Sequence, residues 1–457
     1  MRYFSFIITL LMCSFSFTSC DKVSKADSLS KEYKFEEAAK LYEEAATNGN
    51  SYAKWRLSKA YSNANGVELD WEKAKHLLEE AANEGCEEAK CDVALSYMYG
   101  WDNYEIDEEK GKSLLLDLAK ETDNDYVRIR YAKALLHGRI FEQDKEKAEK
   151  LLESVKDKNN HLYLSTLAEV YLYGGDKIEI NYKKALELFK KAYEQGSSFS
   201  ALGIAYLYGG NDEIEKDVDK VIEWLKKGVE GNNRECMLNL GRMFISEDSV
   251  LAKYHDVNKG LDLIRKAAKH GSGEAYTVLG KCYYFGDNVN KDDDKAYDNY
   301  KKAYKLRDAE GAFLYAFKFI EGRGIEKDIL KGIEIWKDAA EYGSAEAANN
   351  LYCYYYGIEY ESSLKDLDLS RKYLIKAANL NSSKACTNIG NHYYFGSDLF
   401  QKDEVQSFIY YKKAADMGDI DACRVVASFY EEGIGTSKDP QKAKEYRDKT
   451  KAKEEKE

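Results

Sequence analysis

Proline is almost absent from this sequence. One proline occurs in 457 residues, against an average of about 5% in proteins. Because proline removes a backbone donor and clashes with the preceding helical turn, its scarcity permits long stretches of helix. The composition is also 33% charged and 44% hydrophobic. A chain of this kind is expected to be mostly α-helical.

Basic residues are not in excess either. The formal net charge is −12, and binding to nucleic acid needs a basic surface that neutralises phosphates. We therefore expect no nucleic-acid partner. Tyrosine, by contrast, is abundant at 38 residues. A tyrosine can bury its ring and keep its hydroxyl in water, which suits a thin structure in which few side chains lie deep.

Long apolar runs are missing outside the N-terminus. Arg2 is followed by an uncharged, mostly apolar run over residues 3–17, which is typical of a secretory signal and too short for a membrane-spanning helix. The segment Phe17-Thr18-Ser19-Cys20 resembles a bacterial lipobox, with phenylalanine where leucine is usual. Simple cleavage of a secretory signal is the alternative interpretation.

The lipobox interpretation predicts a signal peptide over residues 1–19, a lipid on Cys20 and a short polar tether over residues 20–34. Acyl chains anchor a protein by about 0.8 kcal/mol per buried CH₂. We expect a lipid-anchored protein of the cell envelope, at the outer membrane, which faces either the periplasm or the exterior.

The nine cysteines do not suggest a disulfide framework. Removal of Cys13 with the signal and assignment of Cys20 to lipid leave seven, and an odd number cannot pair completely within one chain. A buried free cysteine behaves as a small hydrophobe, and we interpret the seven in that way.

A small residue, usually alanine, recurs through the chain at intervals of 36 to 39 residues. Apolar residues follow this anchor three and four positions later, and a second alanine usually follows at seven. Such spacing describes one face of an α-helix. The repeat therefore predicts twelve copies of one helix, with anchors at Ala38, Ala74, Gly111, Ala148, Ala185, Val221, Gly260, Ala296, Gly332, Ser370, Ser407 and Ala443.

An Asp or Asn stands four residues before the anchor in each of the eleven complete copies. A side-chain oxygen there can accept from the free N–H groups of the first helical turn. Because each copy contributes one such residue, we interpret the set as helix N-caps and not as metal or acid–base sites. Examples are Asp70, Asp144, Asp217, Asp328 and Asp439.

A second helix precedes each of these, and the whole unit reads A-x₃-L-G-x₂-Y-x₂-G…D-x₂-K-A-x₆-A-x₃-G. Clear copies lie at residues 275–286 and 322–328. This unit resembles the Sel1-like repeat family, a relative of the tetratricopeptide repeats. The resemblance implies an all-α fold, an α/α superhelical solenoid of about eleven helix pairs over residues 35–447, followed by a charged tail over 448–457.

The family resemblance further implies protein–protein contact, often in bacterial envelope or signalling complexes. One cysteine-rich branch links its two helices by a disulfide in every repeat and has been connected with β-lactam binding. The seven cysteines here fall mostly one per copy in the first helix, without a partner in the second. We therefore do not extend that activity to this chain.

Residues with the spacing of an active site are not apparent. The six histidines form no HExxH or similar metal motif, and no GxxxxGK[ST] phosphate loop occurs. We expect no enzyme activity, no metal and no cofactor. The candidates for partner binding are aromatic residues that end the first helix of a pair, since aromatics are frequent binding anchors: Tyr99, Tyr208, Phe285, Tyr356 and Phe395.

The sequence thus predicts a membrane-anchored envelope scaffold or adaptor that holds other proteins or peptides in a helical-repeat groove. The alternative is a binder or hydrolase of small ligands such as cell-wall fragments. Packing between repeats is the competing explanation for each aromatic ring.

Overall fold

The computed structural model describes residues 19–101, 103–357 and 365–454. Helices joined by turns and loops are the only regular secondary structure in these stretches. The predicted signal peptide, apart from Ser19, lies outside the described residues. Two compact units divide the chain, residues 1–272 and 273–457. Among the described residues, no helix combines the length and apolar character needed to cross a membrane.

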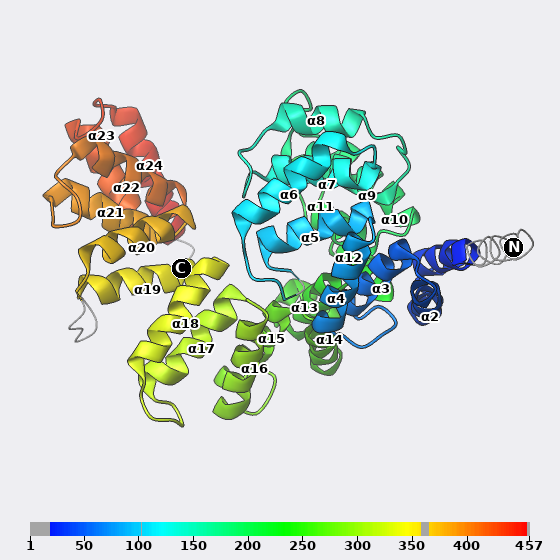
Figure 1. The fold of residues 1–457 in the computed structure, drawn as a ribbon. Coiled ribbons are helices and arrows are strands. Elements are labelled where there is room, and N and C mark those ends of the chain that lie inside the picture. Colours follow the sequence, from blue (N-terminus) through cyan, green and yellow to red (C-terminus); the bar gives the residue numbers. More distant parts are fainter. Residues whose placement is uncertain (1–18, 102, 358–364, 455–457) are drawn as a thin grey trace, which may run out of the picture. The chain divides into compact units, whose positions relative to one another are not determined.

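The helices follow one another as antiparallel pairs (Figure 1). The first unit contains α2 (Phe35–Thr47), α3 (Ser51–Asn63), α4 (Trp71–Asn83), α5 (Glu87–Tyr99), α6 (Glu108–Glu121), α7 (Asp125–His137), α8 (Lys145–Glu153), α9 (His161–Tyr173), α10 (Tyr182–Glu194), α11 (Ser198–Tyr208), α12 (Val218–Glu230), α13 (Arg234–Ile245), the 3₁₀ helix η1 (Ser249–Tyr254) and α14 (Val257–Lys269).

The second unit contains α15 (Gly273–Phe285), α16 (Asp293–Lys305), α17 (Ala309–Glu321), α18 (Ile329–Tyr342), α19 (Ala345–Tyr356), α20 (Leu367–Asn379), α21 (Ser383–Phe395), α22 (Glu404–Asp416), α23 (Ile420–Glu432) and α24 (Pro440–Glu454). The odd-numbered member of each pair from α3–α4 to α23–α24 is called helix A below, and the even-numbered member helix B. The eleven predicted helix pairs are confirmed.

One hydrogen bond joins helix A to helix B in every pair. The backbone N–H of the Asp or Asn that caps helix B donates to a carbonyl near the end of helix A, as from Asp107 to Tyr97 at 2.8 Å and from Asp292 to Tyr283 at 2.9 Å. The residues that accept are Tyr61, Tyr97, Leu135, Tyr171, Tyr208, Phe244, Tyr283, Phe319, Tyr355, Tyr393 and Tyr430. This contact defines equivalent positions in all eleven copies.

The cap residue also fixes the start of helix B. The five carboxylates named above accept from the N–H three residues later at 2.9–3.0 Å. The residue three positions after the cap is lysine in all five. In most copies the ammonium of this lysine lies over an aromatic ring of helix A, as Lys110 does over Tyr97 at 3.8 Å. The D-x₂-K motif is thus a local clasp between the two helices of a pair.

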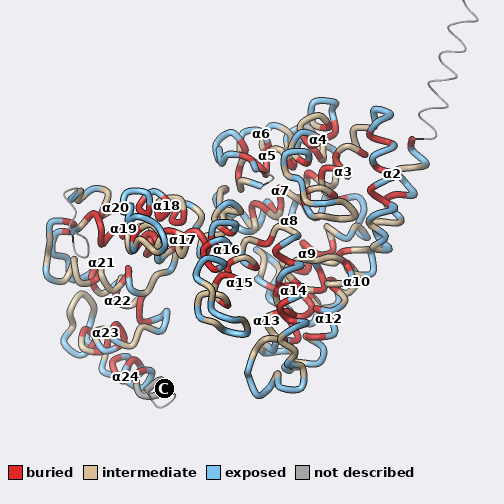
Figure 2. The backbone as a smooth tube through the Cα atoms, turned by 90° about the horizontal axis from the view of Figure 1, so that it is seen from below, coloured by how far each residue is buried: buried red, intermediate tan, exposed pale blue. Residues whose placement is uncertain are grey.

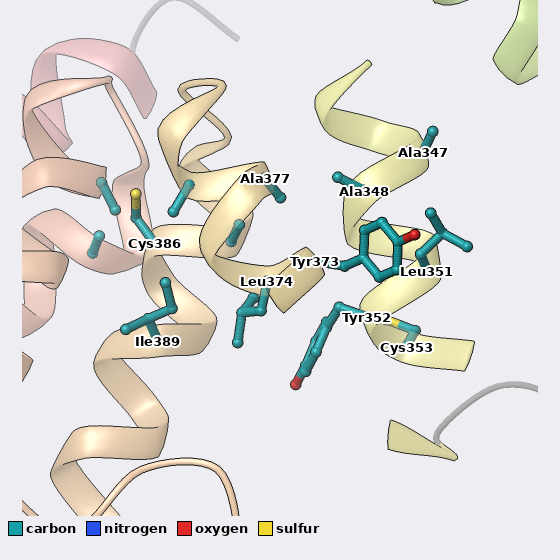
Figure 3. Close-up of a cluster of buried hydrophobic side chains, with 14 of the residues drawn as sticks. Ala347, Ala348, Leu351, Tyr352, Cys353, Tyr373, Leu374, Ala377, Cys386 and Ile389 are labelled. Carbon is teal, nitrogen blue, oxygen red and sulfur yellow. The ribbon is translucent and has the colours of Figure 1, made fainter. Parts of the chain in front are cut away.

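Small residues in the repeat allow the helices to approach closely. A Cβ on Gly280 would lie 2.4 Å from a ring atom of Tyr300 in the partner helix, so only glycine fits there. Figure 3 shows the same principle in the second unit, where Ala377 and Leu374 of α20 pack beside Leu351 of α19 and Ile389 of α21. Buried residues alternate with exposed ones along each helix (Figure 2), as expected for a stacked core.

The tether predicted over residues 20–34 is wrong for most of its length. Residues 19–31 are helical, Ala26 is completely buried, and Val23 and Leu29 pack against the cluster of α2 and α3. Their spacing of three residues places them on one helix face. The segment is therefore a helical partner of α2.

The described part of the charged tail predicted over residues 448–457 is helical. Helix α24 extends to Glu454, and Thr450 is buried with its hydroxyl donating to the carbonyl of Tyr446 at 3.0 Å. Lysine and glutamate have good helix propensity, and the segment contains no glycine or proline that would end the helix.

Candidate functional site

The five aromatics predicted to bind a partner do not form one site. Phe285 and Phe395 are 65% and 74% exposed, whereas Tyr208 is only 9% exposed. Tyr99 is half-buried and stacks on Trp101, and the half-buried Tyr356 stacks on Tyr352. Their roles in binding stay a prediction.

Tyr208 differs from Tyr99, Phe285 and Phe395 in its register. Its carbonyl accepts from Asp217, and Lys220 lies 4.9 Å over its ring. Tyr208 therefore occupies the clasp position held by Tyr97 in another copy, and not the position of Tyr99 two residues later. An alignment of the triplet Tyr206-Leu207-Tyr208 with residues 97–99 places Tyr206 opposite Tyr97. The hydrogen bond to the cap shows that Tyr208 is the residue equivalent to Tyr97, two positions later.

A cavity of about 1150 Å³, lined by both polar and apolar groups, lies within the first unit. Its wall comes from the helix over residues 19–31, the start of α2, helix A residues of α3, α5, α7, α9, α11 and α13, and the loops beside them. Aromatic rings are prominent on this wall: Tyr52, Trp55, Trp101, Tyr126 and Phe199.

The cavity exists because the first unit closes on itself. The side-chain amide of Asn232, between α12 and α13, donates to the carbonyl of Ala64 at 3.2 Å and to Oδ1 of Asn65 at 2.8 Å. His270 contacts the carbonyl of Asn63 through Nδ1 at 3.3 Å. Residues far apart in the chain thus share one wall.

A buried carboxylate stands behind the aromatic wall. Asp92 of α5 is completely buried and accepts from Trp55 Nε1 at 2.8 Å, Tyr126 Oη at 2.8 Å and Lys59 Nζ at 2.7 Å. The donors come from α3 and α7, the helix A elements on either side of α5. Asp92 therefore ties three repeats together.

Charge balance keeps this carboxylate ionised. Burial alone would raise the pKa of Asp92, but the charges of Lys59 and Arg130 outweigh it and lower the pKa below its usual range. Tyr126 behaves in the opposite way, because burial and then the charge of Asp92 hold its pKa well above the usual range. At neutral pH the cluster thus contains a carboxylate, an intact phenol and two cations.

Two arginines lie among the rings of the cavity. The guanidinium of Arg130 lies 5.4 Å from the centroid of Trp101 and 5.8 Å from that of Tyr126. Arg56 pairs with Asp27 at 3.0 Å. Desolvation, followed by the charges of Arg56 and Lys31, lowers the pKa of the nearby His161 to about 4, so this ring is neutral at physiological pH.

Arg56, Asp92 and Arg130 hold the same position in three successive repeats. Each stands five residues before the helix A residue that accepts from the cap, namely Tyr61, Tyr97 and Leu135. In the second unit this position is apolar in three copies and asparagine in two: Val278, Leu314, Asn350, Asn388 and Val425. The sequence contained this signal, but it appears only after the copies are aligned on the clasp.

Thiols and histidines supply no further site. Cys20 is exposed, and the other seven described cysteines are free and buried. Burial raises the pKa of Cys86 and of Cys236 to about 12, which makes these thiols poor nucleophiles. Among the described residues, no cluster of three His, Cys, Asp or Glu side chains is arranged to hold a metal ion.

Comparison with known proteins identifies the repeat. Eleven stretches match the Sel1 repeat, and the chain belongs to the Sel1 repeat family; the matched residues are 31–50, 51–86, 128–160, 164–197, 200–233, 234–272, 273–308, 309–344, 339–382, 383–419 and 420–446. Residues 87–127, which contain Asp92, Trp101 and Tyr126, lie between two matched stretches.

Individual relatives are distant. An uncharacterized protein of Neisseria meningitidis serogroup B is 25% identical over 403 residues, 81% of this chain and 81% of that protein. A Sel1-like repeat-containing protein of Schizosaccharomyces pombe is 26% identical over 264 residues, 57% of this chain. The match spans only 34% of the S. pombe protein. Among solved structures, c5321, a protective antigen of uropathogenic Escherichia coli, is 22% identical with a TM-score of 0.41, covering 92% of this chain and 91% of its own.

Proposed function

We propose that this protein is a membrane-anchored scaffold that binds a segment of another protein in the cavity of the first unit. Repeat solenoids commonly use concave surfaces to hold partners. The cavity has the composition of a binding site, since aromatic rings and arginines are the residues that contribute most to protein recognition. Its volume of about 1150 Å³ suits a few residues of an extended chain.

The observation that carries this proposal is the accessible aromatic wall inside a closed turn of repeats. Phe199 is 47% exposed although it lines the cavity. Trp101, on the same wall, is 42% exposed, and two exposed rings beside one cavity are costly in water unless a ligand covers them. Anchoring through Cys20 is a second part of the proposal, supported by the lipobox-like segment and by the exposure of Cys20 at the first turn of the helix over 19–31.

Site-specific photo-cross-linking in cells tests the binding site. A benzophenone side chain is placed at Phe199, and the matched control is Ile180, which is 49% exposed in the same unit and outside the cavity wall. Discrete protein adducts from position 199 and none from position 180 are expected. Absence of adducts at 199, or the same adducts from both positions, would contradict binding in the cavity.

Fractionation tests the anchor independently. The wild-type chain is expected in the detergent-soluble membrane fraction with acyl chains on Cys20, detected by mass spectrometry of the N-terminal peptide. Cys20→Ser should move the protein to the soluble fraction. A membrane association that survives this substitution argues against lipidation.

A further inference from the structure

Arg130 has hydrogen-bonding capacity that the protein does not use. Its side chain is 19% exposed and lines the cavity. The Nε atom is buried without a hydrogen-bond partner, and the nearest carboxylate oxygen, Oδ1 of Asp92, lies 3.8 Å from Nη2. This distance permits electrostatic attraction but no hydrogen bond.

Asp92 cannot easily supply the missing acceptor. Its Oδ2 atom accepts from Trp55 and Lys59, and its Oδ1 atom accepts from Tyr126. Lys59 and Arg130 are two cations that share this one carboxylate. Arg130 is therefore balanced in charge only in part, and its partly exposed side chain lines a cavity with room for a ligand.

Several other charged groups on the wall are already engaged in ion pairs or hydrogen bonds. Arg56 pairs with Asp27 at 3.0 Å, and Lys156 pairs with Asp123. The carboxylate of Glu88 accepts from the side-chain amide of Asn124 at 2.9 Å. Asp125 accepts from the backbone N–H groups of residues 156 and 157 at 2.9–3.0 Å. Arg130 stands apart from these pairs as a cation without a direct hydrogen bond.

The surroundings of Arg130 fix its guanidinium in place. Trp101 and Tyr126 lie within cation–π distance of it, which restricts the plane of the group before any ligand arrives. A guanidinium held in this way presents parallel N–H groups that match the two oxygens of a carboxylate. Phe199 and Trp101, which are both exposed on the same wall, offer apolar contact to the residue that carries the carboxylate.

We propose that Arg130 binds a carboxylate of the peptide segment held in the cavity, either a chain terminus or an acidic side chain. This inference rests on the proposed function, because it names the group that the cavity recognises. The carboxylate would accept two N–H bonds from Arg130 and would complete the charge balance that Asp92 leaves open.

Three short peptides test the inference with the full chain carrying Cys20→Ser. Acetyl-Ala-Ala-Phe with a free C-terminus, the same peptide as an amide, and the amide of acetyl-Ala-Glu-Phe differ in the presence and the source of a carboxylate. Binding is followed by calorimetry at millimolar peptide. We expect one of the two carboxylate peptides to bind about tenfold more tightly than the neutral amide, and which one does so identifies the source.

Substitutions at Arg130 then assign the effect. Arg130→Gln should abolish the preference for the carboxylate, and Arg130→Lys should restore part of it. The control is Arg139→Gln, which removes an exposed arginine that lies over Tyr99 outside the cavity wall and should leave the preference intact. Circular dichroism confirms that each variant is folded.

Failure of this inference is distinguishable from failure of the proposed function. Equal binding of all three peptides, or an unchanged preference in Arg130→Gln, overturns the role of Arg130 while peptide binding in the cavity stands. If none of the peptides binds, the inference is also wrong. Cross-linking at position 199 decides separately whether the cavity receives a protein segment.

Discussion

Substitution of Asp92 offers the sharpest test of how the first unit is held together. In Asp92→Asn the remaining carbonyl oxygen can still accept from Trp55 and Lys59, and the new amide can donate to the hydroxyl of Tyr126, since these three groups surround Asp92 at 2.7–2.8 Å. The main change is therefore the loss of one negative charge beside Lys59 and Arg130.

The size of the effect follows from burial. Removal of one member of a buried ion pair costs about 3–5 kcal/mol, but the side chains of Lys59 and Arg130 are 30% and 19% exposed and can turn toward water in the cavity. We therefore expect Asp92→Asn to lower the free energy of unfolding by about 2 kcal/mol. Asp92→Leu leaves the donors without an acceptor and should cost about 4 kcal/mol.

The assay can isolate the first unit. Trp336 is the single tryptophan of the second unit, and Trp55, Trp71, Trp101 and Trp224 lie in the first. In a Trp336→Phe background, tryptophan fluorescence during urea unfolding reports the first unit alone. Each Asp92 variant is compared with that background, because long repeat arrays need not unfold in one step.

Coupling with Lys59 supplies the control. Lys59→Met should cost less in the Asp92→Asn background than in its absence, because the partner charge is already gone. Equal costs in both backgrounds, or a loss below about 0.5 kcal/mol for Asp92→Asn, would refute the view that this charge stabilises the unit.

The same substitution predicts a change with pH. Because the folded-state pKa of Asp92 is lowered, its stabilising contribution is complete above the unfolded-state pKa of about 3.9 and is lost as the pH falls through the folded-state value. Asp92→Asn should therefore flatten part of the loss of stability below about pH 4. A profile as steep as that of the parent would contradict the assignment.

Three further predictions concern the repeat itself. Tyr208→Ala should cost about 3 kcal/mol in thermal unfolding because its ring is buried in a clasp. Phe395→Ala, at a residue 74% exposed, should change stability by less than about 0.5 kcal/mol. Equal effects of the two substitutions would show that the register assigned to Tyr208 is wrong. Asp328→Ala removes the acceptor of the Lys331 N–H and should cost about 1 kcal/mol in urea unfolding, while Asp328→Asn retains a cap and should cost little. In the chain from Cys20 onward, a thiol reagent should modify Cys20 rapidly and the seven buried cysteines only after unfolding; rapid modification of several thiols in the native protein would contradict their burial.

The fold could be predicted because the residues that define the helix pair recur in each repeat. The cap, the lysine three residues later and the small anchor recur in one frame, and the contacts that they make lie within a pair or between neighbours. The helix over 19–31 was missed although Val23, Ala26 and Leu29 follow a helical spacing, since its polar residues suggested a tether. A local pattern of three small or apolar residues is weak evidence until its partner surface is known.

The cavity could not be predicted in the same way. Its closure depends on contacts such as Asn232 with Asn65, which join residues five repeats apart. Small rotations between neighbouring repeats accumulate to bring these residues together, and no single repeat encodes the sum. The repeat pattern therefore points to the ends of helix A as candidate binding residues, whereas several wall residues, such as Tyr52, Tyr126 and Phe199, lie in the first turns of helix A.

The residues that depart from the repeat pattern explain more of the cavity in the first unit than the residues that follow the pattern. A solenoid needs no charge at the position of Arg56, Asp92 and Arg130, because valine or leucine serves there in the second unit at Val278, Leu314 and Val425. Burying ions is costly even when they are paired. Three successive copies nevertheless place charges of alternating sign at this position, and the middle one lies in residues 87–127, between the stretches that match the family. Asp92 uses its oxygens to join neighbouring helices, which leaves the donors of Arg130 for a ligand. The cluster thus combines a structural role for its carboxylate with a binding role for one cation, and this division accounts for polar residues that packing alone does not require.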